Sequence, residues 1–533
     1  MFNTPDSDRT PADEPRLGPW HPAAQEDHLL AALLMIAGFS LARALSAVSF
    51  TGFGLDEAYS VAMSRGLALS YFDHPPLHQW ITHVSLLIFG ATPWIRLPFV
   101  LISAVTGWLL YAMTRRVFGG PAGLWALLAF GLSPYFYAVA GSWVSPDGIL
   151  ILCLAGAARA ALTLLSVDRT AVRLPWRRWI VFGVWAGFAG LSKYTAVFLP
   201  AGLLMFLAFA PQHRHWFGHP APYCAAIIGA LIVAPVLVWN GQHDWVSFAF
   251  QAGRAVPVTG GNLERLLTML AGQIGYLSPM IFPCLVIAAL WAIVRSSANG
   301  PERLLLWFAL PSILILTCTP IWGNSGFPHW TMPGWFLLFP LFGGWMTRGR
   351  PFAYWKRVWA GATAGLTLAL AVLFASIQSS DWLERPFPAL LKADPLSETL
   401  SWRPLRAADA FRPAPGWAPA FVVAQNWIEG GKVDLAVGED LPVFVFSVDP
   451  RGFAFRSDPS LFVGADAVIV AQASAIEDLA KNLRPYFAML DVPEPLTLGR
   501  AGRAEVNLRV MRGHGLIRPF PQPYGPWRTR SPS

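Results

Sequence analysis

Residues 28–59 read HLLAALLMIAGFSLARALSAVSFTGFGLDEAY. The first part, 28–50, is an apolar run with the length needed to cross a bilayer as a helix. Two adjacent carboxylates, Asp56 and Glu57, follow closely after it. Charged groups this near to hydrocarbon are costly and are kept mainly where they line a polar cavity. The stretch therefore predicts a membrane helix with an acidic site at one end.

The composition of the whole chain also indicates an integral membrane protein. Of its 533 residues, 54% are hydrophobic and 13% are charged, and the mean hydropathy is +0.45. A water-soluble globular protein cannot bury that much apolar surface. The four cysteines lie inside apolar runs, so they have neither disulfide spacing nor metal-ligand spacing.

Apolar runs of spanning length recur along the first 380 residues and predict about eleven transmembrane helices. The predicted spans are 28–50, 94–113, 121–140, 145–165, 179–191, 194–210, 221–239, 266–294, 303–319, 330–347 and 357–378.

Basic residues cluster in alternate loops between these spans, for example at Arg115 and Arg116, at Arg177 and Arg178, and at Arg295. The positive-inside rule places such loops in the cytoplasm, so the acid-bearing loops face the periplasm or the exterior. The expected location is a bacterial inner membrane. The N terminus is then cytoplasmic and the C-terminal part periplasmic. These scattered basic loops explain the net charge of +8 without a nucleic-acid partner.

Composition divides the chain into three parts. Residues 1–27 are polar, lack a signal-peptide pattern and predict a disordered cytoplasmic tail. Residues 28–380 form the transmembrane domain, and 381–533 carry prolines, charges and short β-rich runs. The last part predicts a small periplasmic α/β domain. Its expected strands are 420–423, 442–447, 466–471 and 505–510, and its expected helix is 473–483. The fold class is therefore an all-α polytopic membrane protein with a small C-terminal α/β domain.

Two further loops, predicted on the same side of the membrane as Asp56 and Glu57, hold candidate site residues. The segment Tyr71-Phe72-Asp73-His74-Pro75-Pro76-Leu77 holds an acid and an imidazole in a turn stiffened by prolines. The segment Ser145-Pro146-Asp147 opens a span with an acid at its outer end. Each acid taken alone also fits an ordinary helix N-terminus, where carboxylates are favourable.

The combination of these segments resembles glycosyltransferase family 39, the C-class membrane enzymes that include protein O-mannosyltransferases and lipid A aminoarabinose transferases. Asp56-Glu57 resembles the acidic pair of that family, Asp73-His74-Pro75-Pro76-Leu77 its proline turn, and Ser145-Pro146-Asp147 its second acidic loop. Similar segments follow at Gly190-Leu191-Ser192-Lys193-Tyr194-Thr195, at Trp239-Asn240 with Asp244-Trp245-Val246-Ser247-Phe248, and at Pro328-His329-Trp330.

The resemblance implies a glycosyltransferase with the C-class fold. It would move a sugar from a polyprenyl-phosphate donor to a lipid, glycan or protein acceptor at the periplasmic face, with inversion at the anomeric carbon. Some aminoarabinose-transferring relatives carry Lys where this chain has His74, so that sugar is not specifically indicated, and the sugar and the acceptor stay open.

The needs of such a reaction assign roles to the residues. A carboxylate must deprotonate the acceptor hydroxyl, and Asp56 is the candidate, with Glu57 and Asp147 as further catalytic acids. Cations or a metal must stabilise the leaving phosphate.

Candidate phosphate ligands are His74, Lys193 and His329. Asp147 with Glu57 can hold a divalent ion, Mg²⁺ or Mn²⁺, through hard oxygen ligands. We expect Asp73, Tyr59, Tyr194 and Trp330 to line the substrate cavity.

Two of these residues could instead have a purely structural role. Lys193 can be a side chain that reaches the interface from a helix end, and His329 can belong to an aromatic belt beside Trp330.

The periplasmic part shows no catalytic motif. Asp449-Pro450-Arg451-Gly452 is interpreted there as a turn, and the domain is expected to cap the cavity or to touch the acceptor.

The rival functions are a transporter or flippase of lipid-linked sugars and a non-catalytic membrane scaffold. A transporter would place ionisable groups near the middle of its helices and would show repeated halves, whereas the acids here gather at outer loop ends.

Overall fold

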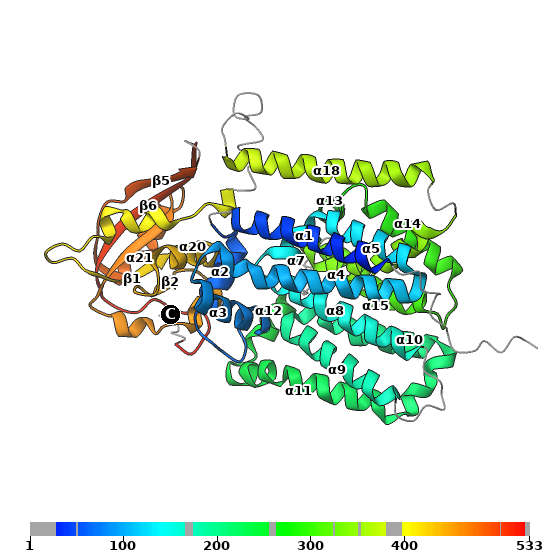
Figure 1. Cartoon of the computed structure of the whole chain (residues 1–533). Coiled ribbons are helices and arrows are strands. Elements are labelled where there is room, and N and C mark those ends of the chain that lie inside the picture. Colours follow the sequence, from blue (N-terminus) through cyan, green and yellow to red (C-terminus); the bar gives the residue numbers. More distant parts are fainter. Residues whose placement is uncertain are drawn as a thin grey trace, which may run out of the picture.

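The computed structural model describes residues 28–49, 52–165, 174–254, 263–322, 326–349, 353–379, 397–500 and 503–527. A bundle of helices forms the first part of the chain, and a sheet domain lies at one end of that bundle (Figure 1). This arrangement confirms the predicted architecture of a mostly helical protein with a small C-terminal sheet domain. The predicted tail, 1–27, lies outside the described residues.

The helices of the bundle are α1 (Leu29–Ser49), α2 (Leu55–Met63), α3 (Leu77–Phe89), α4 (Leu97–Phe118), α5 (Gly120–Leu132), α6 (Pro134–Tyr137), α7 (Val139–Ser142), α8 (Pro146–Leu164), α9 (Leu174–Ser192), α10 (Phe198–Phe209), α11 (Pro220–Gln242), α12 (Val246–Gly253), α13 (Leu263–Leu277), α14 (Phe282–Arg295), α15 (Pro301–Trp322), α16 (Met332–Phe336), α17 (Phe339–Thr347) and α18 (Tyr354–Ser379). The C-terminal domain adds α20 (Trp427–Val437) and α21 (Ile476–Leu483). Short 3₁₀ turns that matter below are η2 (Tyr194–Val197), η4 (Pro328–Thr331) and η8 (Arg451–Phe455).

Within the described residues, five helices are long and apolar enough to cross a membrane, and up to eight spans result if three bent helix pairs each count as one. The chain is therefore a multi-pass membrane protein, with fewer clear spans than the eleven that the sequence predicts. Breaks explain part of this difference. The predicted span 121–140 is α5 joined to α6 and α7 at 84°, and the predicted span 266–294 is α13 joined to α14 at 99°.

The break between α5 and α6 has a local cause. Ser133 precedes Pro134, and it is extended, with ψ at 122°, because a residue before proline disfavours the helical region. Arg43 of α1, buried at 2% exposure, then donates hydrogen bonds to the carbonyls of Phe136 and Tyr137. A side chain thus satisfies backbone groups that an unbroken helix would have paired, as lipid surroundings require.

The C-terminal sheet contains β1 (Pro419–Ala424), β2 (Val443–Val445), β3 (Asp466–Gln472), β4 (Phe487–Leu490), β5 (Glu494–Arg500) and β6 (Arg503–Leu516). Its order is β2-β1-β3-β6-β4, and β5 also pairs with β6. β1 is parallel to β2 and β3, whereas β6 is antiparallel to its neighbours. The four predicted strands correspond to β1, β2, β3 and β6, while β4 and β5 were not predicted.

The sheet buries both faces because side chains alternate along each strand. Phe421 and Val423 of β1 lie in one core with α21. Val422 and Ala424 lie in the other core, which also holds Tyr59 and Met63 of α2. α20 packs against α2, so the hydrophobic core of the C-terminal domain continues into the helical part.

The packing of α20 against α2 is close. A Cβ atom at Gly431 would lie 2.5 Å from the backbone nitrogen of Tyr59, which leaves no room for a side chain there. One residue later, Lys432 donates hydrogen bonds to the backbone carbonyls of Phe53, Glu398 and Leu400. These contacts fix the C-terminal domain over the helix ends, beside α2 and α12 (Figure 1).

Candidate active site

A cavity of about 690 Å³ lies between the helix ends and the C-terminal domain. All ten residues that the sequence predicts for the site line this cavity, namely Asp56, Glu57, Tyr59, Asp73, His74, Asp147, Lys193, Tyr194, His329 and Trp330. They come from α2, the α2–α3 loop, the start of α8, the junction between α9 and η2, and η4. The structure thus brings together segments that are up to 274 residues apart, from 56 to 330. Their chemical roles stay predictions.

Asp56 stands in the first turn of α2 and faces the cavity. Its carboxylate makes no hydrogen bond or ion pair with another residue of the described part of the chain, which leaves its oxygens available to a substrate. Burial by the surrounding protein raises the pKa of Asp56, and the nearby Arg451 charge opposes that rise. A free carboxylate with a raised pKa is a suitable proton acceptor.

Glu57 has a different environment from its neighbour. Arg96 of the turn before α4 donates to both carboxylate oxygens, at 2.9 Å to Oε1 and 2.7 Å to Oε2. The backbone N–H groups of Val144 and Gly54 donate to the same two oxygens, each at 3.0 Å. Glu57 and Arg96 are each 1% exposed. With two donors on each oxygen, Glu57 ties together α2, α4 and the segment before α8.

Asp147 forms the second acidic centre of the cavity. Its Oδ1 atom accepts from Lys193 Nζ at 2.8 Å and from Tyr135 OH at 2.7 Å. Lys193 is extended between the end of α9 and η2, so its side chain turns from the helix end toward Asp147. It is 6% exposed and paired, which does not fit a side chain that reaches toward water from a helix end.

The divalent ion expected at Asp147 and Glu57 does not fit these contacts. A carboxylate accepts about four hydrogen bonds, and Glu57 already receives four. Asp147 shares Oδ1 with an ammonium group and a hydroxyl. In the part of the chain that the structure describes, no group of three or more His, Cys, Asp or Glu side chains is placed to hold a metal.

Asp73 connects the helical part to the C-terminal domain. Tyr59 OH donates to Asp73 Oδ1 at 3.1 Å, and Arg451 Nη1 lies 3.4 Å from Asp73 Oδ2. The N–H of Gly452 donates to Tyr59 OH at 2.9 Å. Gln251 of α12 donates to the Asp73 carbonyl at 2.9 Å. The proline turn predicted to hold Asp73 is thus also held from α12 and from η8.

Arg451 is a cavity residue that the sequence analysis missed, because its segment was interpreted as a simple turn. Its φ of 49° lies in the left-handed region that few non-glycine residues adopt. Tyr524 OH accepts its N–H at 2.7 Å and donates to Asp449 at 2.8 Å, which holds the turn. Its guanidinium stacks on Trp427, 3.6 Å from the ring centroid. The C-terminal domain therefore delivers a cation and an aromatic ring to the cavity.

Arg254, at the end of α12, is a second cation that was missed. Its guanidinium carbon lies 4.4 Å from the Phe250 ring centroid and 5.6 Å from that of Trp330. The turn before α12 depends on two left-handed residues, Asp244 and Trp245, at φ 54° and 57°.

The two predicted histidines lie in the cavity but carry no charge near neutral pH. Burial, aided by the Lys193 charge, lowers the pKa of His74 to about 3 and that of His329 to about 4. Neutral imidazoles can donate or accept a hydrogen bond but cannot neutralise a phosphate. The cations that line the cavity are therefore Lys193, Arg254 and Arg451.

Known proteins resemble the chain in sequence and in fold. Residues 73–239 match the family described as dolichyl-phosphate-mannose-protein mannosyltransferase. The lipid A galacturonosyltransferase RgtD of Rhizobium johnstonii is 30% identical over 293 residues, which are 54% of this chain. The match spans 59% of the length of that curated relative.

Two crystal structures of ArnT from Cupriavidus metallidurans show the fold. The structure bound to undecaprenyl phosphate has a TM-score of 0.63 at 16% identity, over 91% of this chain and 98% of ArnT. The apo structure has a TM-score of 0.61 at 16% identity, over 90% of this chain and 98% of ArnT. The resemblance to glycosyltransferase family 39 is thereby confirmed, and the chain has the fold of the C-class membrane glycosyltransferases.

Proposed function

We propose that this protein transfers a sugar from a polyprenyl-phosphate donor to an acceptor hydroxyl, with Asp56 as the general base. The observation that carries this proposal is the pairing pattern of the cavity acids. Glu57, Asp73 and Asp147 each have a cationic partner, whereas Asp56 is the one among them whose carboxylate has no partner within the residues that the structure describes. A base must be free to approach the proton that it removes.

The reaction is a single displacement. Asp56 takes the proton of the acceptor hydroxyl while the acceptor oxygen forms a bond to the anomeric carbon. The bond from that carbon to the phosphate oxygen breaks, and the lipid phosphate leaves with the electron pair. Because the acceptor attacks from the side opposite the leaving group, the configuration at the anomeric carbon inverts. The proton on Asp56 is later lost to solvent.

The leaving phosphate needs positive charge where its own negative charge develops. Lys193 and Arg254 can supply it, and His74 and His329 can add hydrogen bonds as neutral imidazoles. Asp147 holds the Lys193 ammonium at 2.8 Å and so keeps it oriented in the cavity. No step requires a divalent ion at Asp147 and Glu57: both oxygens of Glu57 and Oδ1 of Asp147 already accept hydrogen bonds.

The donor and acceptor classes follow from the relatives. ArnT was crystallised with undecaprenyl phosphate, which supports a polyprenyl-phosphate donor here. The curated relative RgtD acts on lipid A, which supports a saccharide lipid as the acceptor and a uronic acid as one sugar to test. Protein and other glycan acceptors remain alternatives.

We also propose a sidedness, with about eleven spans in the inner membrane, a cytoplasmic N terminus and a periplasmic C-terminal domain. Arg116 lies near the end of α4 and Arg295 at the end of α14. The cavity acids Asp56 and Asp147 lie instead at the starts of α2 and α8, where the C-terminal domain is docked. Basic ends in the cytoplasm and the cavity in the periplasm satisfy the positive-inside rule.

The test uses purified protein in nanodiscs with a panel of polyprenyl-phosphate sugars and lipid A as the acceptor. Acceptor-dependent release of polyprenyl phosphate from one donor is the expected result. Movement of an intact donor between leaflets without release would favour the transporter alternative, which the family match does not favour. No release and no movement across the panel would favour the scaffold.

A further inference from the structure

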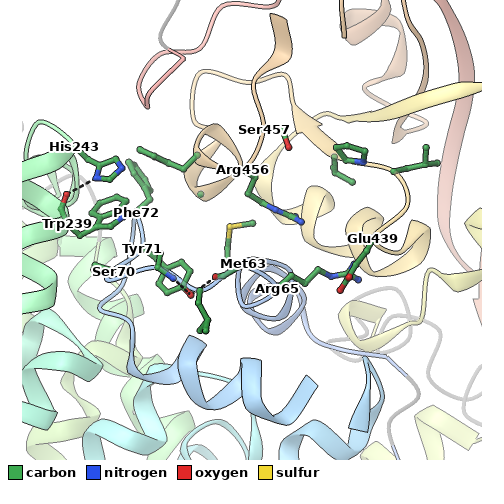
Figure 2. A pocket seen from close by; sticks show the side chains of 18 of the residues that line it. Met63, Arg65, Ser70, Tyr71, Phe72, Trp239, His243, Glu439, Arg456 and Ser457 are labelled. Atoms are coloured by element: carbon green, nitrogen blue, oxygen red, sulfur yellow. Dashed lines mark hydrogen bonds and ion pairs between the residues drawn. The ribbon is translucent and has the colours of Figure 1, made fainter. Parts of the chain in front are cut away.

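A second cavity, of about 570 Å³, lies beside the first. It is enclosed by the end of α2 with the loop after it, by the end of α11, and by the C-terminal domain (Figure 2). None of the ten predicted site residues lines it. The mechanism above does not use this space.

Two arginines, Arg65 and Arg456, line this cavity. Arg65 Nε lies 3.1 Å from Asp434 Oδ1, and Arg456 contacts the other oxygen of the same carboxylate. Asp434 is 2% exposed and lies behind the lining, so one buried acid serves two guanidinium groups. Glu439 lies 3.7 Å from Arg65, but it is 80% exposed at the rim, where water screens its charge. Asp434 already bridges Arg65 and Arg456, which lie on different segments of the lining (Figure 2), so an anionic ligand would bind to the guanidinium N–H groups that this carboxylate does not occupy.

Aromatic rings form the opposite wall. At the end of α11, the rings of Trp239 and His243 stack with their centroids 4.1 Å apart and their planes at 14°. The ring centroid of Phe455 lies 5.5 Å from that of Trp239. Phe72 lines the same wall. A cavity that combines aromatic faces with a few polar groups suits a ligand that has one apolar face and one polar edge. A sugar ring is such a ligand, because its C–H face is apolar and its hydroxyl edge is polar.

The cavity also borders surface that faces lipid. Leu67, at 64% exposed, lines its mouth. Leu237 and Val238, which directly precede Trp239 in α11, are 44% and 47% exposed. α11 is one of the helices long and apolar enough to span the membrane. Acyl chains attached to a bound headgroup can therefore lie along α11 while the headgroup enters the cavity.

A thin wall separates this cavity from the reaction cavity. Phe72 lines the second cavity and Asp73 the first, and Gly452 lines the second and Arg451 the first. The chain thus passes from one cavity to the other within one residue at two places. A molecule held in the second cavity is next to the wall that carries the contact between Asp73 and Arg451.

We propose that the second cavity binds the anionic saccharide headgroup of the glycolipid acceptor, with Arg456 and Arg65 on its acidic group. This proposal rests on the proposed transfer reaction, because it names the acceptor side of it. The reacting hydroxyl would belong to a part of the acceptor that reaches past the shared wall toward Asp56.

The test compares two variants with a matched control. Ser457→Phe fills the cavity without a change of charge, and Arg456→Gln removes one of the two cations. Arg412→Gln removes an arginine of the same domain whose side chain is 71% exposed and outside the cavity. Native mass spectrometry measures binding of lipid A and of its dephosphorylated form to each full-length protein, and kinetics measures KM for donor and acceptor separately.

We expect Ser457→Phe and Arg456→Gln to weaken lipid A binding and to raise the acceptor KM at least tenfold, with the donor KM as in Arg412→Gln. The thermal midpoint should be unchanged in Ser457→Phe, whereas Arg456→Gln also removes a partner of the buried Asp434 and should lower it. Removal of the phosphates should weaken binding to wild type but little to Arg456→Gln. Equal lipid A binding by all variants would overturn the proposal, and so would equal competition by phosphatidylglycerol. Since binding is measured without transfer, failure of the site and failure of the reaction are distinguished.

Discussion

Arg451 Nη1 of the C-terminal domain lies 3.4 Å from Asp73 Oδ2 of the α2–α3 loop. This contact joins two segments 378 residues apart, and both of its residues line the reaction cavity. The C-terminal domain therefore completes the candidate active site and does more than cover it, since Trp427 of the same domain also lines the cavity.

The pH dependence of transfer should depend on the charge of Arg451. Burial raises the pKa of Asp56, and Arg451 is the charge that most opposes the rise; Asp73 and Asp147 add to it, and Lys193 lowers it. A base works only when ionised, so activity falls as pH drops through this pKa. Arg451→Gln removes a charge that favours the carboxylate. The acid limb of the profile of kcat/KM should then move to higher pH, with a loss of about tenfold or more at neutral pH.

Arg451→Lys, which keeps the charge, should leave the acid limb closer to its wild-type position. Arg412→Gln serves as the control, because Arg412 is exposed and outside the cavity. An unchanged acid limb in Arg451→Gln would show that Arg451 does not act on the base.

The pair Glu57–Arg96 should prove structural. Both side chains are 1% exposed, and the carboxylate receives four hydrogen bonds. Removing one partner of a buried ion pair costs about 3–5 kcal/mol, because the other charge stays buried alone. We expect Glu57→Gln to lower the thermal midpoint in detergent clearly, while the protein that stays folded keeps most of its kcat. Loss of kcat at an unchanged midpoint would instead restore Glu57 as a catalytic acid.

The pair Lys193–Asp147 allows a double-mutant cycle. Lys193→Met leaves the Asp147 carboxylate unpaired in a buried site, and Asp147→Asn leaves the ammonium unpaired, so each change should destabilise the protein. The double variant should be more stable than the sum of the two single effects predicts. It should still be inactive, because Lys193 is proposed to stabilise the leaving phosphate. Recovery of transfer in the double variant would contradict that role.

Metal removal offers a further check. The oxygens of Glu57 are fully occupied, and Asp147 is bound by Lys193 and Tyr135. Dialysis against EDTA should therefore leave the transfer rate within about twofold of the untreated enzyme. A loss that Mg²⁺ or Mn²⁺ restores would show that an ion displaces some of these donors during the reaction.

Much of the site could be predicted because its residues stand in short local patterns. Asp56 follows a spanning run, Asp73 stands before two prolines, and Asp147 opens a span. All of them reach one cavity because helix ends on one side of a membrane must meet there. Lys193 and His329 were placed by the same logic.

The remaining part of the site depends on packing between distant segments. Arg451 enters the cavity only because α20 approaches α2 closely at Gly431, and no local pattern encodes that approach. Arg96 looked like the start of a span, so the saturation of Glu57 could not be predicted. Broken helices such as α5 with α6 also escape a search by length and hydropathy alone.

The central claim is that Asp56 is the general base. Asp56→Asn keeps the shape of the side chain and removes its proton affinity, and the loss of a positioned base costs about 10²–10⁴-fold in rate. The most direct measurement is kcat for release of polyprenyl phosphate by wild type and Asp56→Asn in nanodiscs, with donor binding measured in parallel. We predict a fall in kcat within that range at unchanged donor affinity and thermal midpoint. A kcat within about threefold of wild type would contradict the account.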